Sequence, residues 1–488
     1  MKCFALPALA ALAAAAPEAD LVEQLPGFDK HSGFKVYSGF LTVPGPLNGY
    51  DELKIHYQFQ TAQNGTEASK PVVTWHQGGP GGSSIFGQYG EMGYFQVDDA
   101  GEHVNPHAWN QVANMLYLES PAGSDDPIGF STCAKGGAVQ RRCEWSDVTQ
   151  AEAYAHTLKA FFAAFPEFAS HDLYLSGESY AGQYLPNIAH YILNNPAVVS
   201  NLKGIAVGNG CWGGDATTVN CNGPNAEQND MDMYYGKGLM AKKEYGLVYA
   251  ACSFPLTGRP TVKCDAALEK ASAEVGPHNV YDIYDNCPTT EAWLAKSGKS
   301  MRWLKNYLRA QLSANRPRAE WHAELLGLSG GYDWGCNQLP ELQKYMQRAD
   351  VQAALHLGKP GLSGFGYKQS GPASVLLYPK LIQNLRVLIY NGDSDACVPY
   401  KGNEEWTTGM VAKGVVTENA AWHPWYLGKR SDGLPPAGYA TTYAVTNATA
   451  QDASFEFVTV RLAGHMVPGF QPKAALAFFK SYIEGTAL

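Results

Sequence analysis

The chain has 488 residues, of which 45% are apolar and 17% are charged, and its formal net charge is −9. This composition excludes disordered, collagenous and coiled-coil proteins. Lys and Arg number 36 against 45 Asp and Glu, with no long basic run, so nucleic acid is not an expected partner. Length alone suggests roughly three domains, or one large α/β domain with insertions.

The first stretch has the pattern of a secretory signal peptide. Lys2 supplies a positive charge, and the run from Phe4 to Ala15 is apolar with one proline and ends in small residues. We expect residues 1–15 to be removed, so that the mature chain starts at Ala16. This run is too short to span a membrane, and no other apolar run reaches about 18 residues. The expected location is the secretory pathway, leading to the extracellular space or to a vacuole or lysosome.

An exported chain also meets the machinery for N-glycosylation. Sequons begin at Asn64 and at Asn447. Both are candidate glycosylation sites, although sequons are common by chance in a chain of this length.

Short apolar runs that end in turn residues predict buried strands along the chain. They cover residues 71–75, 115–118, 173–175, 204–207, 387–390 and 455–460. The segment after Asp147 repeats an apolar residue every three or four positions, and so does the segment 185–192, as in amphipathic helices. This alternation predicts an α/β fold with a mostly parallel central sheet flanked by helices.

The stretch 211–372 has a different character. It holds six of the ten cysteines, many charges and several tryptophans, with few strand-like runs. We interpret it as a helical, disulfide-pinned cap insertion. It would divide one domain into the segments 16–210 and 373–488.

The strongest chemical motif surrounds Ser179. The sequence Gly177-Glu178-Ser179-Tyr180-Ala181 follows a predicted strand and precedes a predicted helix. This is the context of a nucleophile elbow, where a serine occupies the apex of a sharp turn between small residues. Ala181 replaces the second glycine of the usual G-x-S-x-G pattern. Ser179 is the candidate nucleophile.

A serine nucleophile needs a base, and the base needs an acid that orients it. Asp393 and Asp395 follow the predicted strand 387–390, and His465 follows the predicted strand 455–460. The order Ser, Asp, His is that of α/β-hydrolases, and the ends of sheet strands are the usual place for such groups. Spacing alone leaves either aspartate as the acid, and His465 competes with the alternative of an ordinary loop histidine.

A glycine-rich loop follows the strand at 71–75 and covers residues 76–84. Backbone N–H groups of such a loop can stabilise the negative charge that develops during acyl transfer. The N–H groups of Gly79 and Tyr180 are the natural oxyanion hole. The loop lacks dinucleotide-binding spacing, and the chain lacks H-E-x-x-H and paired C-x-x-C motifs, so we expect no cofactor and no catalytic metal.

Taken together, the motifs resemble the serine carboxypeptidases, which are lysosomal and vacuolar exopeptidases with an α/β-hydrolase fold. The resemblance rests on residues 78–84, 177–182, 392–395 and 464–468, and it extends from Leu25 to the final predicted helix around 474–482. It implies a catalytic triad of Ser179, Asp395 and His465. It also implies that C-terminal amino acids are released from peptides and proteins through an acyl-enzyme.

The resemblance further implies how the free C-terminal carboxylate of a substrate is held. The side chains of Gln77, Glu91 and Glu178 and the N–H of Gly78 would bind it. Two carboxyl groups in one site cannot both ionise cheaply, so one should keep a proton and donate it to the substrate. This predicts an acidic pH optimum for peptides. The family usually has Asn at position 77 and Cys at position 82, where this chain has Gln77 and Gly82.

Nine cysteines remain once Cys3 leaves with the signal peptide. We expect the pairs Cys133–Cys143, Cys211–Cys221, Cys252–Cys264 and Cys287–Cys336. Sequence alone does not fix connectivity, and the resemblance supports only the last pair. Cys397 is outside these four pairs.

Two other functions compete with the peptidase. A serine-carboxypeptidase-like acyltransferase would pass the acyl group to an alcohol. Such relatives often have Asp at the position of Glu178, so the presence of Glu here favours hydrolysis. The unusual Gln77 weakly favours the acyltransferase. A catalytically silent secreted binding protein is disfavoured because all three triad residues are present. The expected partner is therefore a peptide or protein with a free C-terminus.

Overall fold

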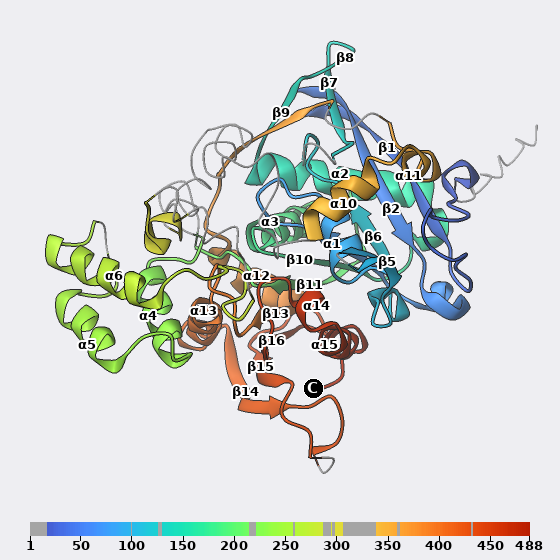
Figure 1. The fold of residues 1–488 in the computed structure, drawn as a ribbon. Helices are drawn as coiled ribbons and strands as arrows, with labels where there is room; N and C mark the ends of the chain where they lie inside the picture. The colour runs from blue at the N-terminus through green and yellow to red at the C-terminus, as the bar shows by residue number, and fades with distance from the viewer. Residues whose placement is uncertain are drawn as a thin grey trace, which may run out of the picture.

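The fold is seen in a computed structural model that describes residues 17–98, 100–124, 129–213, 221–256, 259–285, 294, 298–305, 338–358, 362–430 and 433–488. A large twisted sheet runs through the centre of the molecule, with helices on both of its faces (Figure 1). The α/β architecture predicted from the sequence is confirmed.

The central sheet has the strand order β14-β15-β16-β13-β11-β10-β3-β6-β2-β7-β8, with β1 paired to β2. Neighbours from β16 to β6 are parallel, whereas the strands added at either edge are antiparallel. All six predicted strands belong to the parallel part. The strands are β1 (Val36–Leu47), β2 (Tyr50–Gln60), β3 (Val72–His76), β6 (Asn114–Leu118), β7 (Thr132–Lys135), β8 (Ala138–Val139), β10 (Leu173–Glu178), β11 (Leu202–Gly208), β13 (Arg386–Gly392), β14 (Val416–Trp425), β15 (Gly438–Val445) and β16 (Ser454–Val460).

Helices cover both faces of this sheet. One face packs against α2, α3, α12 and α13, and the other packs against α15. The two helices predicted from the sequence are α2 and α3. The bounds are α1 (Ile85–Gly90), α2 (Asp147–Ala164), α3 (Ala181–Asn194), α12 (Tyr378–Asn384), α13 (Tyr400–Ala412), α14 (Val467–Phe470) and α15 (Pro472–Glu484).

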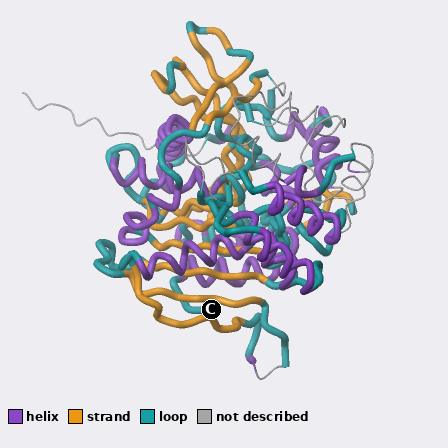
Figure 2. Tube along the Cα trace, turned by 90° about the vertical axis from the view of Figure 1, so that its left-hand side faces the viewer, coloured by secondary structure: helices purple, strands orange, loops and turns teal. Residues whose placement is uncertain are grey.

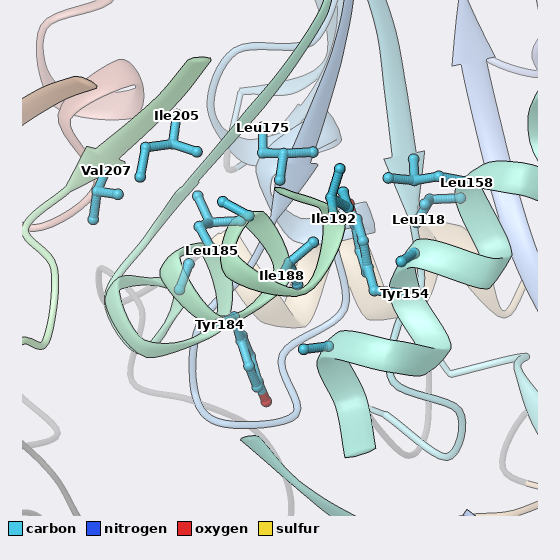
Figure 3. Packing of buried hydrophobic residues seen from close by; sticks show 14 of the residues in the cluster. Leu118, Tyr154, Leu158, Leu175, Tyr184, Leu185, Ile188, Ile192, Ile205 and Val207 are labelled. Carbon is cyan, nitrogen blue, oxygen red and sulfur yellow. The ribbon is translucent and has the colours of Figure 1, made fainter. Parts of the chain in front are cut away.

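Alternation along each strand explains the two layers. Leu173 and Leu175 of β10 join the cluster that contains α3, whereas Tyr174 joins the cluster of α15. Figure 3 shows Leu185 and Ile188 of α3 packed beside Leu175. Each fully buried leucine contributes roughly 2 kcal/mol. This packing holds the turn between β10 and α3 in place.

The described part of the range 211–372 divides into two groups of helices. In the first, α4 (Ala226–Gly236), α5 (Lys242–Ala251) and α6 (Val262–Val275) form their own hydrophobic cluster beside the sheet (Figure 1). In the second, α10 (Gln338–Met346) and α11 (Ala349–Ala354) pack with the segment around Phe28 and Phe95. The boundaries of the cap insertion stay a prediction, and its described helices belong to two separate hydrophobic clusters.

Two small sheets complete the fold. Strand β4 (Phe95–Asp98) pairs with β5 (Gly101–Val104), and β9 (Arg142–Ser146) pairs with β12 (Gly364–Lys368). The hairpin of β7 and β8 projects from the body of the molecule (Figure 2). None of the described helices is long and apolar enough to cross a membrane.

Disulfides join Cys133 to Cys143, Cys211 to Cys221 and Cys252 to Cys264. The expected pair Cys287–Cys336 and the signal peptide both lie outside the described residues. Each candidate glycosylation site is exposed at a turn, with φ of 61° at Asn64 and 54° at Asn447.

Candidate active site

Ser179 lies at the tip of a sharp turn between β10 and α3. Its φ is 63°, a conformation that is costly for a residue with a side chain. The turn is held from both sides, because Ser179 N–H donates to Gly208 O at 3.0 Å and Ser179 O accepts from Cys211 N–H at 2.9 Å. A Cβ at Gly177 would lie 2.3 Å from His76 O, so only glycine fits there. This is the geometry of a nucleophile elbow.

His465 and Asp395 are in direct contact. The distance from His465 Nδ1 to Asp395 Oδ2 is 2.7 Å, and both side chains are fully buried. Asp395 also accepts from Cys397 N–H at 2.7 Å and from Val398 N–H at 3.1 Å. The carboxylate is thereby fixed in an orientation that faces the imidazole.

Asp393, the alternative acid, points elsewhere. Its Oδ1 accepts from Leu462 N–H at 2.9 Å, and its Oδ2 pairs with Lys237 Nζ at 3.0 Å. The structure therefore brings Asp395, and not Asp393, to His465.

Asn209 is a site residue that the sequence analysis missed. Its Nδ2 donates to Asp395 Oδ2 at 2.7 Å, and its Oδ1 accepts from Gly392 N–H at 2.9 Å. The side chain thus bridges the ends of β11 and β13. Asn209 directly follows β11, and a search of every strand's carboxyl end for polar residues would have found it.

A second missed group comes from the range 211–372, which we predicted to be an insertion. His465 N–H donates to Tyr281 O at 2.7 Å, and the two rings lie 5.1 Å apart. Ser394 O and Val280 O take part in further backbone hydrogen bonds, with Ile283 N–H and Ala396 N–H, both at 3.0 Å. The segment 280–283 therefore contacts the loops of both Asp395 and His465.

The glycine loop lies against the elbow. A Cβ built on Gly78 would come within 2.5 Å of Ser179 Cβ and of Tyr180 N. The loop is closed by a hydrogen bond of 2.8 Å from Gly82 N–H to Gly78 O. Gly79 has a φ of 117°, a value that favours glycine. Absence of a side chain at 78 allows the loop backbone to approach the two residues where an oxyanion would form.

The side chain of Tyr180 is anchored away from its backbone N–H. Its hydroxyl donates to Asp147 Oδ1 at 3.1 Å, and the Tyr367 hydroxyl donates to the same oxygen at 2.8 Å. Burial raises the pKa of Asp147 to about 6. Asp147, which begins α2, therefore joins Tyr180 to Tyr367 of β12.

The side chains of Gln77, Glu91 and Glu178 form a buried group beside the elbow, each at most 1% exposed. Gln77 Nε2 donates to Glu178 Oε1 at 2.6 Å, and Gln77 Oε1 accepts from the Trp75 indole at 2.8 Å. Glu91 is close enough to Glu178 and Gln77 for both side chains to affect its pKa. All the residues expected to bind a substrate carboxylate are therefore neighbours, together with Gly78.

Burial raises the pKa of both acids in this group. The pKa of Glu91 rises to about 8 because its carboxyl group is fully buried, and neither of its oxygens has a hydrogen-bond partner among the described residues. For Glu178, burial and the nearby charge of Glu91 raise the pKa well above its usual range. The two carboxyl groups titrate as a pair. At mildly acidic pH the pair retains protons that can be donated to an anion.

Comparison with known proteins shows which proteins this chain is similar to. Residues 26–485 match the family model described as serine carboxypeptidase. The chain is 30% identical to the lysosomal protective protein of Mus musculus, covering 96% of this chain and 94% of the relative. It is 28% identical to serine carboxypeptidase 1 of Hordeum vulgare, covering 97% and 94%. A prohormone-processing carboxypeptidase from Saccharomyces cerevisiae has a similar fold, with a TM-score of 0.60 and 19% identity, covering 92% of this chain and 91% of the other.

Proposed function

This chain belongs to the serine carboxypeptidase family, and we propose that it releases single C-terminal amino acids from peptides and proteins through an acyl-enzyme on Ser179. The observation that carries the proposal is the buried carboxyl pair, Glu91 and Glu178, beside the nucleophile elbow. A general esterase has no need of protonated acids at this place. An enzyme that binds the terminal carboxylate of a peptide does need protonated acids here, because they can donate hydrogen bonds to it.

The proposed reaction assigns one step to each candidate residue of the site. His465 takes the proton of the Ser179 hydroxyl as its oxygen attacks the last peptide bond, and Asp395 keeps the imidazole oriented through Nδ1. The N–H groups of Gly79 and Tyr180 stabilise the oxyanion. His465 then protonates the amine of the departing amino acid. Water, activated by the same histidine, hydrolyses the acyl-enzyme.

The carboxylate site determines which bond is cut. Gln77, Gly78 and the protonated carboxyl pair would hold the terminal carboxylate, so that only the last peptide bond reaches Ser179. Because binding requires a proton on Glu91 or Glu178, peptide hydrolysis should be favoured on the acidic side. The fully buried amide of Gln77 takes the place of the family's usual Asn, and its contact with Glu178 supports the same role.

We also propose that the protein acts after export, in the extracellular space or in a vacuole or lysosome. Three disulfides support passage through an oxidising compartment, and one relative is named as a lysosomal protein. The exposed turns at Asn64 and Asn447 are accessible to glycosylation. An acidic compartment would suit the proposed carboxylate site.

One assay tests the peptidase proposal. The purified protein is incubated at mildly acidic pH with an N-blocked dipeptide, with and without an organofluorophosphate, and the released C-terminal amino acid is measured. We expect release that the inhibitor abolishes and that Ser179→Ala lacks. Transfer of the acyl group to an added alcohol, with little free acid product, would identify an acyltransferase. No release and no labelling of Ser179 would identify a silent binding protein.

A further inference from the structure

A chain of four buried polar side chains connects the glycine loop with the insertion. Ser83 Oγ donates to Glu119 Oε1 at 3.0 Å, and Glu119 Oε2 lies 3.7 Å from His56 Nδ1. His56 Nε2 lies 3.2 Å from Ser38 Oγ, which donates to Leu355 O at 2.6 Å. The four side chains are at most 1% exposed. We call Ser83, Glu119, His56 and Ser38 the polar chain.

The contacts of Ser38 fix the direction of the hydrogen bonds. Its only proton is given to Leu355 O, so its oxygen must accept from His56. His56 therefore carries its proton on Nε2, and its Nδ1, at 3.7 Å from Glu119 Oε2, is beyond hydrogen-bond distance. The hydrogen-bonded link between the two residues is Ser131 Oγ, which accepts from His56 N–H at 2.9 Å and donates to Glu119 O at 2.7 Å.

The titration of the two ionisable members agrees with this arrangement. Burial lowers the pKa of His56 to about 3 and raises the pKa of Glu119 to about 8, although Phe130 N–H, Ser83 and Ser131 donate to the carboxyl. Both side chains are then neutral in mildly acidic solution. A neutral network avoids the large cost of a buried, unpaired charge.

The polar chain ends at the loop that approaches the nucleophile. Ser83 directly follows Gly82, whose N–H closes the loop onto Gly78 O. The near end of this loop touches Ser179 and Tyr180 through Gly78. The far end is held by the contact between Ser83 and Glu119. A glycine-rich loop has little stiffness of its own, so this anchor, together with the hydrogen bonds from Gly81 N–H to the Tyr184 hydroxyl and from Ser84 Oγ to Trp75 O, helps to set where its N–H groups point.

We propose that Glu119 is a positioning residue that holds the oxyanion loop in place, and that the polar chain couples this loop to the end of α11 through Ser38 and Leu355. The inference rests on the proposed function, because it concerns the same Ser179 chemistry. It assigns a role to an acid that touches no reacting atom.

The test compares kcat, KM and the inhibition constant of a peptide aldehyde, which forms a tetrahedral oxyanion on Ser179, across four variants. Glu119→Ala should lower kcat at least about thirtyfold, and Ser38→Ala, remote from the reacting atoms, about fivefold. Glu119→Gln, a neutral amide of the same shape, should stay within about threefold of wild type. In the two alanine variants KM should change less than about twofold, while aldehyde binding weakens in proportion to the loss of kcat/KM.

Ser363→Ala is the matched control. Ser363 is also buried and also donates to a distant backbone carbonyl, Gln140 O, at 2.6 Å. We expect it to lower the melting temperature as much as Ser38→Ala does but to keep wild-type kcat. Equal kcat in Ser38→Ala and Ser363→Ala would overturn the inference, as would a Glu119→Gln enzyme as impaired as a folded Glu119→Ala. If Glu119→Ala does not fold, the kcat values of Ser38→Ala and Glu119→Gln test the inference.

A failure of the proposed function can be distinguished from a failure of this inference. A wild-type protein that releases no amino acid from dipeptides would refute the peptidase. The polar chain would then be tested by the rate at which p-nitrophenyl acetate acylates Ser179 in the same variants, which requires the oxyanion hole but no carboxylate site. The same order of rates among the variants supports the inference, and equal rates overturn it.

Discussion

The side chain of Gln77 occupies the space that a side chain at Gly82 would need. A Cβ built on Gly82 would lie 2.9 Å from Gln77 Cγ and 3.3 Å from Gln77 Cβ. The family usually has a shorter Asn at the first position and a Cys at the second. The two departures of this chain from its family are therefore neighbours in space.

A double-mutant cycle tests whether positions 77 and 82 interact energetically. We expect Gly82→Ala alone to destabilise the fold by about 1–3 kcal/mol, because its methyl group meets Gln77. With Gln77→Ala in the same chain, which removes Cγ, the cost of Gly82→Ala should fall by at least about 0.5 kcal/mol. Urea denaturation of the four proteins measures the coupling. Additive effects would show that the two positions are independent; the 3.0 Å approach to Gly78 O predicts incomplete rescue.

The two candidate acids should differ sharply on substitution. Asp395→Asn would remove the acceptor that orients His465, and kcat should fall roughly ten-thousand-fold. Asp393→Asn affects only a pair with Lys237 and a turn at Leu462, so kcat should fall less than about tenfold. Steady-state kinetics on one dipeptide measures both. Similar losses would mean that the acid is misassigned.

These aspartates also show what the sequence could and could not predict. The parallel strands, α2, α3 and the elbow at Ser179 were predicted because hydrophobic period and turn residues are local signals. The sequence left two candidates for the triad acid, Asp393 and Asp395, because both follow the same strand. Only the fold decides which of them contacts His465. The edge strands, such as β1 with its two glycines and two prolines, carry a weaker signal.

The missed site residues have a common cause. Asn209 meets Asp395 across 186 positions of sequence, and Tyr281 reaches His465 from within the insertion. Neither belongs to a recognisable short motif. Long-range hydrogen bonds of this kind depend on how the strands are ordered in the sheet, which no local pattern specifies.

Asn209 should matter for catalysis without touching substrate. Asn209→Ala would remove one donor from Asp395 and one acceptor from Gly392, and we expect kcat to fall about tenfold with little change in KM. Asn209→Asp should be worse, because it places a second carboxylate beside Asp395. Steady-state kinetics, which gives kcat and KM separately for each variant, measures these effects. A change confined to KM would contradict a role in orienting the triad acid.

The carboxyl pair predicts different pH profiles for different substrates. As the pH rises through about 8, the pKa of Glu91, the pair loses protons and kcat/KM should fall for a dipeptide with a free carboxylate. A dipeptide ester or amide, which has no carboxylate, should keep its activity. Glu178→Gln should reduce the difference, since an amide donates at every pH. Identical profiles for both substrates in the wild-type enzyme would refute a protonated carboxylate site.

The buried acids also predict loss of stability toward alkaline pH. Glu91 and Glu119 have pKa values of about 8 when folded and 4.5 as unperturbed groups, so the folded state holds protons that the unfolded chain releases. Each carboxyl therefore lowers the free energy of unfolding by about 1.4 kcal/mol per pH unit between those values. Below pH 6.5 the effect is opposed by His56 and His76, which burial keeps neutral with pKa values of about 3 and 4.

The net decline should thus be steepest between pH 6.5 and 8, where only the carboxyls titrate. Urea denaturation across this range measures it, and Glu119→Gln should reduce the slope by about 1.4 kcal/mol per pH unit because one proton is no longer released. Glu23→Gln, which alters an exposed carboxyl, is the control and should leave the slope unchanged. A stability that rises from pH 6.5 to 8 would show that these carboxyls are already ionised in the folded protein.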